Sequence, residues 1–324
     1  MAVEQHEASA SPAMPRVVAI VGPTASGKAS LGRLAARRLS LPVLVCDSVK
    51  VYRGLDIGSA KPTPEQRAEL RHELVDLVDP DEPFSAGDYA RHAWPHLSAG
   101  RGLVVGGTGF YLRALGWTVT EGGPGADLPP DDPERVAFEE RWLEREAADP
   151  AAIARALAAV DPSTARSIHP NNHVRLLRAL WLCERLHGPV SAARHVDPPQ
   201  ARIQLMMVVV DPDPAVLRSR IESRLDRMLA AGWLREVEKL REAGYDARHK
   251  AMRSLGYRQL LEVVEGRCSL DEARETILVQ TRQYARRQRA YLRTQLPAER
   301  IVTVRDPAAC PWGQLEGFLH HATP

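Results

Sequence analysis

The feature that most constrains the fold is an apolar run that leads directly into a glycine-rich loop. Residues 17–21 read VVAIV, and the sequence GPTASGK follows at positions 22–28. Glycine lets the backbone turn so that successive N–H groups converge, and the helix that begins after the loop adds its positive N-terminal dipole. Lys28 supplies a full positive charge to the same space. The segment therefore predicts a buried strand, a phosphate-binding loop and a helix that packs on a sheet.

This phosphate loop follows the pattern GxxxxGK[ST] except at its last position. It consists of Gly22, Pro23, Thr24, Ala25, Ser26, Gly27, Lys28 and Ala29. Ala29 stands where a hydroxyl usually holds magnesium, and Ser30 lies about 100° further around the helix. The sequence therefore predicts a site for a nucleotide or a diphosphate but assigns no magnesium ligand in the loop.

Strands and helices alternate after the loop, with strands expected at 41–46 and 102–106 and helices at 65–71 and 86–98. This order predicts an α/β fold with a doubly wound parallel sheet of the P-loop NTPase type. Ligands gather at the carboxyl ends of parallel strands. Asp47 and Thr108 each follow an expected strand, so we expect both near the phosphate loop.

The 324 residues are enough for two domains or for one domain with an insertion. Helical periodicity predicts helices at 133–148, 151–159, 172–187, 214–231, 232–243, 256–265 and 270–295, and a returning core strand at 203–210. The expected organisation is a disordered tail at 1–15, the first part of the core at 16–122, a small helical insertion at 123–200 that contacts the ligand, a core strand with C-terminal helices at 201–305, and a tail at 306–324.

The polar segment DSVKVYRGLDIGSAKP at positions 47–62 follows the second strand directly. Asp47 could be a base, a metal ligand or a ribose contact, and the alternative is a simple turn residue. Its polar neighbours favour a functional role for Asp47, because a polar stretch after a buried strand usually lines a binding site. These neighbours are Ser48, Tyr52, Arg53, Asp56 and Lys61.

Arginines gather on two of the expected C-terminal helices. Arg220, Arg224 and Arg227 have helical spacing and could clamp a phosphate, or they could form a solvated face. The segment 281–293 carries five arginines, no acidic residue, and the interleaved rings of Tyr284 and Tyr291. Such a pattern is typical of RNA binding, in which arginines contact phosphates and rings stack on bases. A solvated amphipathic helix is the alternative.

Several classes of protein are disfavoured. Four cysteines without CxxC spacing argue against a zinc site and a disulfide framework, and they fit a reducing, cytoplasmic compartment. His169 and His173 have no acidic or thiol partner nearby in the sequence, so a helix-entry turn is favoured over a metal site. The N-terminal residues do not resemble a signal peptide, and no apolar run approaches the ~20 residues of a membrane span.

In their order along the chain, these motifs resemble the tRNA dimethylallyltransferases, also called isopentenyl-tRNA transferases. The likeness covers about residues 16–305. The segment 47–62 is its most specific part, because many other proteins share the phosphate loop. The remaining matching segments are 106–111, 169–171 with Arg175 and Arg178, 253–258 and 281–293.

The resemblance implies transfer of a dimethylallyl group from dimethylallyl diphosphate to N6 of adenosine 37, in the anticodon loop of tRNA, by a monomer that uses Mg2+. The phosphate loop would hold the diphosphate, and Lys28 and Arg224 would neutralise it. Asp47 would take the proton from N6, with Thr108 beside the reacting centre. The implied tRNA contacts are Asp47, Ser48, Val49, Lys50, Arg175, Arg178, Arg253, Arg258, Arg286, Arg287 and Arg293.

The chain also departs from the family pattern. Members usually carry Thr at the position of Ala29, Gln at Lys50, Glu at Trp181, and Thr-Trp at Ala290-Tyr291. Ala29 puts magnesium coordination by the phosphate loop in doubt. Lys50 could alter recognition of the adenine, because glutamine both donates and accepts hydrogen bonds while lysine only donates them. Three alternatives remain open: an adenylate isopentenyltransferase, a P-loop kinase, and a catalytically weakened or inactive tRNA-binding paralogue.

Overall fold

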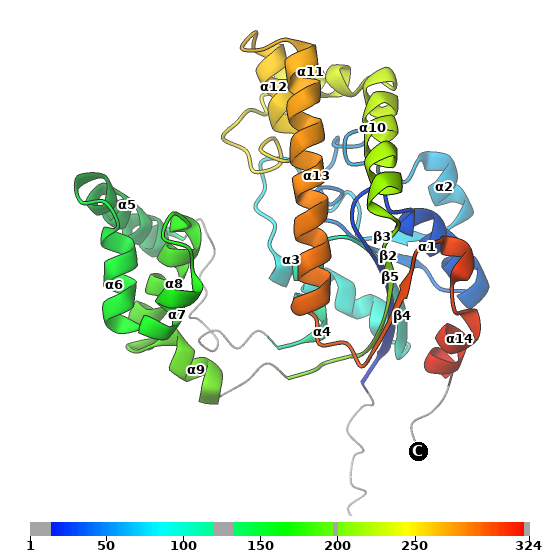
Figure 1. The fold of residues 1–324 in the computed structure, drawn as a ribbon, viewed down its shortest axis with the longest axis horizontal. Helices are drawn as coiled ribbons and strands as arrows, with labels where there is room; N and C mark the ends of the chain where they lie inside the picture. The colour runs from blue at the N-terminus through cyan, green and yellow to red at the C-terminus, as the bar shows by residue number, and fades with distance from the viewer. Residues whose placement is uncertain (1–13, 119–131, 197–199, 321–324) are drawn as a thin grey trace, which may run out of the picture. The chain divides into compact units, whose positions relative to one another are not determined.

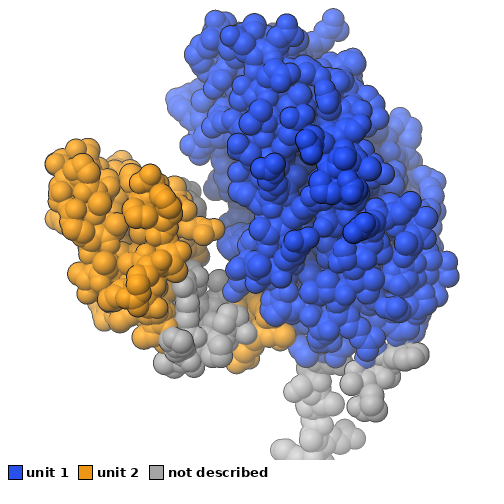
Figure 2. Space-filling model, in the orientation of Figure 1, with its two compact units in different colours: residues 1–116, 202–324 blue, residues 117–201 orange. Residues whose placement is uncertain are grey.

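The computed structural model describes residues 14–118, 132–196 and 200–320. Most of the expected N-terminal tail (1–15) and of the glycine- and proline-rich linker (122–132) lies outside these residues. The chain divides into two compact units, which Figure 2 colours separately. Unit 1 comprises residues 1–116 and 202–324, and unit 2 comprises residues 117–201. Unit 2 begins six residues before the expected start of the insertion at 123.

Unit 1 is built on six parallel strands in the order β3-β2-β4-β1-β5-β6 (Figure 1). With helices between the strands, this arrangement confirms the α/β fold. The strands are β1 (Arg16–Val21), β2 (Val43–Cys46), β3 (His72–Glu73), β4 (Arg101–Gly106), β5 (Gln204–Val210) and β6 (Arg300–Val304). The short strand β3 and the edge strand β6 were not expected; β6 follows the last expected helix, 270–295.

Strand β1 lies in the middle of the sheet because its side chains are apolar on both faces. Val18 and Ile20 belong to one core cluster, and Val17 and Ala19 on the opposite face are also fully buried. In register, Val21 of β1 lies beside Gly106 of β4, which pairs with Cys46 of β2. The residues that follow these strands therefore meet at one edge of the sheet.

The helical elements of unit 1 connect the strands and extend beyond them. They are α1 (Lys28–Leu39), α2 (Pro64–Glu69), α3 (Ala86–Ala93), η1 (Trp94–Leu97), α4 (Gly109–Gly116), α10 (Pro214–Ala230), α11 (Trp233–Glu242), α12 (Tyr257–Val264), α13 (Leu270–Thr294), η2 (Pro307–Ala309) and α14 (Trp312–His320). The long helix α13, orange in Figure 1, packs against α10, α12 and α4. It begins with a capping box between Ser269 and Glu272.

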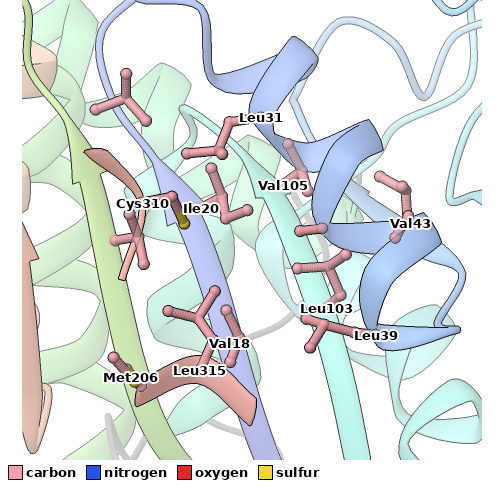
Figure 3. Close-up of a cluster of buried hydrophobic side chains, with 14 of the residues drawn as sticks. Val18, Ile20, Leu31, Leu39, Val43, Leu103, Val105, Met206, Cys310 and Leu315 are labelled. Carbon is pink, nitrogen blue, oxygen red and sulfur yellow. The ribbon is translucent and has the colours of Figure 1, made fainter. Parts of the chain in front are cut away.

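The segment 306–324 is not the tail that the sequence analysis expected, because it contains α14. Leu315, Phe318 and Leu319 of this helix are buried in the same core as Val18 and Ile20 (Figure 3). The Arg16 guanidinium also donates to the Phe318 carbonyl oxygen at 3.1 Å. The apolar residues at i, i+3 and i+4 give this short helix one face that fits the sheet.

Apart from one isolated antiparallel bridge between Trp117 and Ala201, the regular structure in the described part of unit 2 is helical. Its helices are α5 (Pro133–Ala148), α6 (Ala152–Val160), α7 (Pro162–Ser167), α8 (His173–Leu186) and α9 (Val190–Val196). They enclose a separate core in which the Trp181 indole packs edge-on against Phe138. The buried Asp161 carboxylate accepts hydrogen bonds from the backbone N–H groups of Thr164 and Ser191, and these bonds join α7 to the start of α9. No helix in the described residues of either unit is long and apolar enough to cross a membrane.

Candidate active site

The phosphate loop turns tightly between β1 and α1, and both glycines are required by geometry. A Cβ atom on Gly22 would lie 2.4 Å from the Val210 carbonyl oxygen. Gly27, the N-cap of α1, has a φ of 97°, which favours glycine. Among the described residues, the N–H groups of Ala25, Gly27 and Ala29 donate to no protein acceptor. These donors at a helix N-terminus have the arrangement expected of the anion-binding cradle that the sequence predicts.

Lys28 is the first residue of α1, and its ammonium group donates to the Pro23 carbonyl oxygen at 3.0 Å. Burial, followed by the charge of Arg224, lowers the pKa of Lys28 to about 7, while the Asp47 carboxylate acts in the opposite direction. An anion in the loop would favour the charged lysine, because opposite charges stabilise each other.

Asp47 follows β2, and Thr108 follows β4, so the sheet register brings their loops together. The Thr108 hydroxyl accepts a hydrogen bond from the N–H group of Ser48 at 3.1 Å. One carboxylate oxygen of Asp47 accepts from the N–H groups of Val49 at 2.9 Å and Lys50 at 3.3 Å. These bonds fix the carboxylate as a hydrogen-bond acceptor at the carboxyl edge of the sheet, where proton transfer to Asp47 is chemically reasonable.

Helix α10 contributes two arginines on one face, four residues apart. Arg220 donates to the Ser26 carbonyl oxygen at 3.2 Å and so holds the phosphate loop itself. Burial lowers the pKa of Arg224, and the Asp47 carboxylate opposes this shift. Burial also lowers the pKa of Lys50, with Asp47 again opposing. Asp47 therefore faces three cations, Lys28, Lys50 and Arg224, in one partly buried group.

Most other polar side chains of the segment 47–62 hold the segment in place and do not line the site. The Lys61 ammonium is 2% exposed and donates to the Tyr52 carbonyl oxygen at 2.8 Å and to the Asp76 carboxylate at 2.6 Å. The Glu236 carboxylate on α11 accepts from three consecutive N–H groups of residues 56–58, at 3.0, 2.6 and 3.2 Å. The inference that polar neighbours indicate a lined site is therefore wrong for Lys61.

One stripe of α13 faces the loop that contains Thr108. Burial raises the pKa of Tyr284, and the nearby Thr108 side chain acts weakly in the opposite direction. Four residues later, the Gln288 amide donates to the Gly107 carbonyl oxygen at 2.9 Å. A Cβ atom on Gly109 would lie 2.4 Å from the Tyr291 ring. Positions 284, 288 and 291 have the spacing of one helix face, so both half-buried rings lie against this part of unit 1. Stacking of these rings on bases stays a prediction.

Four arginines in the C-terminal half of α13 fall into two groups. Arg289 donates to the Asp211 carboxylate at 2.5 Å, and Arg293 lies 3.5 Å from the same carboxylate. Asp211 follows β5, so Arg289 at least serves the fold. Arg286 and Arg287 are exposed, and the Arg287 guanidinium lies over the Tyr284 ring. These two arginines are available to a polyanion, and the Arg293 side chain is also exposed.

The remaining arginines of the sequence prediction lie further along the chain. Arg253 and Arg258 are exposed near α12, and Arg258 donates to the Gln280 side chain at 3.2 Å. Arg175 and Arg178 lie on α8 of unit 2, whose first turn is capped by the Asn172 side chain. The cap agrees with the expected helix-entry turn at 169–173. The structure therefore places the predicted RNA contacts on both units.

The residues around the loop do not fit a magnesium ion held by the phosphate loop. Ala29 is exposed and presents a methyl group, and the Ser30 hydroxyl accepts from Arg33 at 3.5 Å. The described residues contain no group of three His, Cys, Asp or Glu side chains arranged around a metal position. Asp47 supplies one carboxylate, which already interacts electrostatically with Lys28, Lys50 and Arg224.

Sequence reasoning missed two residues that shape this site, Gln288 and Glu236. Both are polar residues on amphipathic helices, where they look like ordinary surface positions. The spacing of Gln288 from Tyr284 and Tyr291 was a usable signal, because all three belong to one helix face. Glu236 gave no comparable signal, since its partners lie about 180 residues earlier.

Comparison with known proteins agrees with this geometry. The family model for IPP transferase matches residues 50–295, and the model for isopentenyl transferase matches residues 15–79. A tRNA dimethylallyltransferase of a Roseiflexus species is 42% identical over 286 residues, which is 86% of this chain and 90% of that protein. One from Pelobacter propionicus is 41% identical over 283 residues, or 86% of this chain and 89% of that protein.

Solved structures show the same relationship. The tRNA isopentenylpyrophosphate transferase of Bacillus halodurans has a TM-score of 0.61 and 31% identity, with 89% of each chain covered. A eukaryotic dimethylallyltransferase acting on tRNA has a TM-score of 0.75 over 91% of this chain and 75% of that one, and at 22% identity it shows likeness of fold alone. The phosphate loop, the site at the sheet edge and these similarities lead to one conclusion: the chain belongs to the IPP transferase family, with the tRNA dimethylallyltransferases.

Proposed function

We propose that this protein transfers a dimethylallyl group from dimethylallyl diphosphate to N6 of adenosine 37 in the anticodon loop of tRNA. The observation that carries the proposal is that the phosphate loop, Asp47 and Thr108 meet at one edge of the sheet. A diphosphate cradle and a carboxylate base are the two functions that such a transfer needs.

The phosphate loop acts on the leaving group. As the bond between the allylic carbon and the diphosphate oxygen breaks, the diphosphate keeps the electron pair and its negative charge grows. The N–H groups of Ala25, Gly27 and Ala29 and the charge of Lys28 stabilise that charge. Arg224, which faces Asp47 and Lys28, adds a second cation. Fixed donors directed at developing charge are usually the largest catalytic contribution.

Asp47 acts on the acceptor. The adenine N6 uses its electron pair to form the new carbon–nitrogen bond, and it then loses one proton, which the Asp47 carboxylate accepts. A positioned base typically contributes about 10²–10⁴-fold to the rate. Thr108 holds the start of the Asp47 loop through its bond to the Ser48 N–H group. The adenine must leave its stack to reach Asp47, and such an extruded base needs contacts to its neighbours.

Positive side chains provide those contacts in this proposal. Arg286 and Arg287 on α13 and the exposed Arg253 and Arg258 would bind tRNA phosphates from unit 1, and Arg175 and Arg178 would do so from unit 2. Magnesium enters the proposal as the counterion that a diphosphate carries with its own water ligands, because Ala29 offers no side-chain oxygen to hold it.

The test uses purified protein, dimethylallyl diphosphate, magnesium and unmodified tRNA, with mass spectrometry of the digested nucleosides. We expect prenylated adenosine with the wild type and at least a 100-fold lower rate with Asp47→Ala, because the base is removed. Binding of tRNA should persist in that variant, since the arginine contacts are unchanged. Equal rates for Asp47→Ala and wild type would rule out Asp47 as the base.

Two alternative activities are separated by the same assay. Ala29 and Lys50 favour a weakened or inactive tRNA-binding paralogue, for which tRNA would bind without product. Adenosine monophosphate offered in place of tRNA tests the adenylate isopentenyltransferase, for which free nucleotide would be the better acceptor. We expect product with tRNA only.

A further inference from the structure

We propose that Gln288 is a positioning residue that fixes the phosphate loop against the loop carrying Thr108, so that the leaving group and the acceptor keep their alignment. The Gln288 side-chain oxygen accepts the N–H group of Thr24 at 2.8 Å, and its amide nitrogen donates to the Gly107 carbonyl oxygen at 2.9 Å. One side chain thereby joins the phosphate loop to the loop that carries Thr108.

Burial and fit show that this bridge is built into the site. Gln288 is 7% exposed, and both ends of its amide are paired. A Cβ atom on Gly107 would lie 2.4 Å from the Gln288 amide nitrogen, so the glycine is needed for the close approach. A buried polar side chain with a donor and an acceptor both satisfied rigidifies its surroundings.

The choice of side chain is specific. A bridge between an N–H group and a carbonyl oxygen needs one acceptor and one donor, which glutamine provides at a single end. Glutamate at this position could accept from Thr24 but could not donate to Gly107, and leucine could do neither. Asn would be shorter by one methylene. The proposal concerns positioning, because Gln288 contacts the two loops and not the reacting atoms.

The inference rests on the proposed function, in which Thr24 belongs to the diphosphate loop and Thr108 lies beside the acceptor. If the bridge is lost, the phosphate loop can move relative to Thr108 while the exposed arginines stay in place. Misplacement of reacting groups by about 1 Å can cost on the order of 100-fold in rate. We therefore expect a slower chemical step and weaker binding of diphosphate, with tRNA binding unchanged.

The experiment compares wild type with Gln288→Leu and Gln288→Glu. Three quantities are measured for each folded protein: the Kd for inorganic pyrophosphate without tRNA, the Kd for tRNA, and kcat with saturating tRNA and dimethylallyl diphosphate. We expect Gln288→Leu to weaken pyrophosphate binding roughly 3- to 10-fold, as for loss of one net hydrogen bond, and to lower kcat about 10- to 100-fold. The Kd for tRNA should stay within about twofold of wild type.

Gln283→Leu is the matched control, because Gln283 is an exposed glutamine on the same helix; it should leave pyrophosphate binding unchanged. A purely structural role predicts a lower Tm for Gln288→Leu with unchanged kcat and pyrophosphate Kd, and that result overturns the proposal. If Gln288→Leu does not fold, the same measurements on Gln288→Glu decide between the two roles, since this variant keeps the size of the side chain and the bond to Thr24. Failure of both variants to fold also contradicts a role limited to alignment.

The measurements also separate this inference from the proposed function. If wild type forms no prenylated adenosine, the proposed function fails, and the pyrophosphate arm still tests the bridge. If wild type is active and Gln288→Leu matches it in kcat and in pyrophosphate binding, only the bridge is wrong.

Discussion

Lys28 shows how a single residue can report on the site before any substrate binds. Burial and the Arg224 charge lower its pKa from 10.5 to about 7 in the free protein. A bound diphosphate stabilises the ammonium form and raises that pKa. We therefore predict that pyrophosphate binding at pH 8 takes up part of a proton, and that affinity falls as the pH rises above about 7. Calorimetry at pH 8 in two buffers of different ionisation enthalpy measures the uptake.

The control for this prediction is Lys28→Met, which removes the titrating group and keeps an unbranched side chain. Subtracting its proton uptake from that of wild type removes the contribution of pyrophosphate itself. Equal uptake in both proteins would show that Lys28 stays charged in the free site. The lowered pKa also affects stability. Because the unfolded chain binds the Lys28 proton more tightly than the folded protein does, Lys28 makes the free energy of unfolding rise with pH between about 7 and 10.5.

At the scale of elements, α13 combines two roles. Tyr284 and Gln288 pack against the Thr108 loop, while Arg286 and Arg287 are exposed, with the Arg287 guanidinium over the Tyr284 ring. Arg289 serves neither role, because it pairs with Asp211 after β5. Five arginines in one segment therefore do not make one uniform binding surface.

This division predicts a specific salt dependence of tRNA binding. Reversing the charge of Arg286 and Arg287 together to Glu should weaken tRNA binding at low salt. It should also reduce the slope of log K against log salt by roughly 1 to 2, as for the loss of two phosphate contacts. Filter binding at several salt concentrations measures the slope. The double reversal of Arg300 and Arg305, two exposed arginines at β6, changes the net charge equally and should leave the slope nearly unchanged. If both double reversals reduced the slope equally, the arginines would act through the general electrostatic attraction of tRNA, and α13 would not contact tRNA phosphates.

For the whole molecule, the two chain segments that connect unit 2 to unit 1 are paired with each other. The N–H group of Arg202 donates to the Gly116 carbonyl oxygen at 2.8 Å, and the N–H group of Thr118 donates to the Gln200 carbonyl oxygen at 2.8 Å. Trp117 and Ala201 form an antiparallel bridge between these two pairs. Unit 2 also has its own hydrophobic core around Trp181. It is therefore attached as a separable insertion.

We predict that replacing residues 119–199 by a short glycine- and serine-rich linker leaves a folded core. That protein should bind pyrophosphate with wild-type affinity, because the phosphate loop lies entirely in unit 1. Its affinity for tRNA should fall on the order of tenfold or more, since Arg175 and Arg178 are lost. Calorimetry and filter binding measure the two affinities. Unchanged tRNA affinity would remove unit 2 from the interface, and loss of pyrophosphate binding would show that the core depends on unit 2.

The sequence by itself determined the parts of this protein that depend on local patterns. The run VVAIV and the loop at 22–28 specify a central strand and an anion cradle, because burial on both faces and tight turning each leave a local signature. Parallel strands with common carboxyl ends then place Asp47 and Thr108 at the same edge. The order of motifs was enough to identify the family.

Only the tertiary structure decided which polar residues face the site and which hold the fold. Lys61 looks like a ligand residue in sequence, yet its partner Asp76 lies on a separate loop. Gln288 looks like a surface residue, yet it meets Thr24, 264 positions earlier. Helix α14 looks like a tail until Leu315 is placed against β1 and α1. In each case the deciding contact joins residues that only chain folding brings together, and no periodicity in the sequence records that contact.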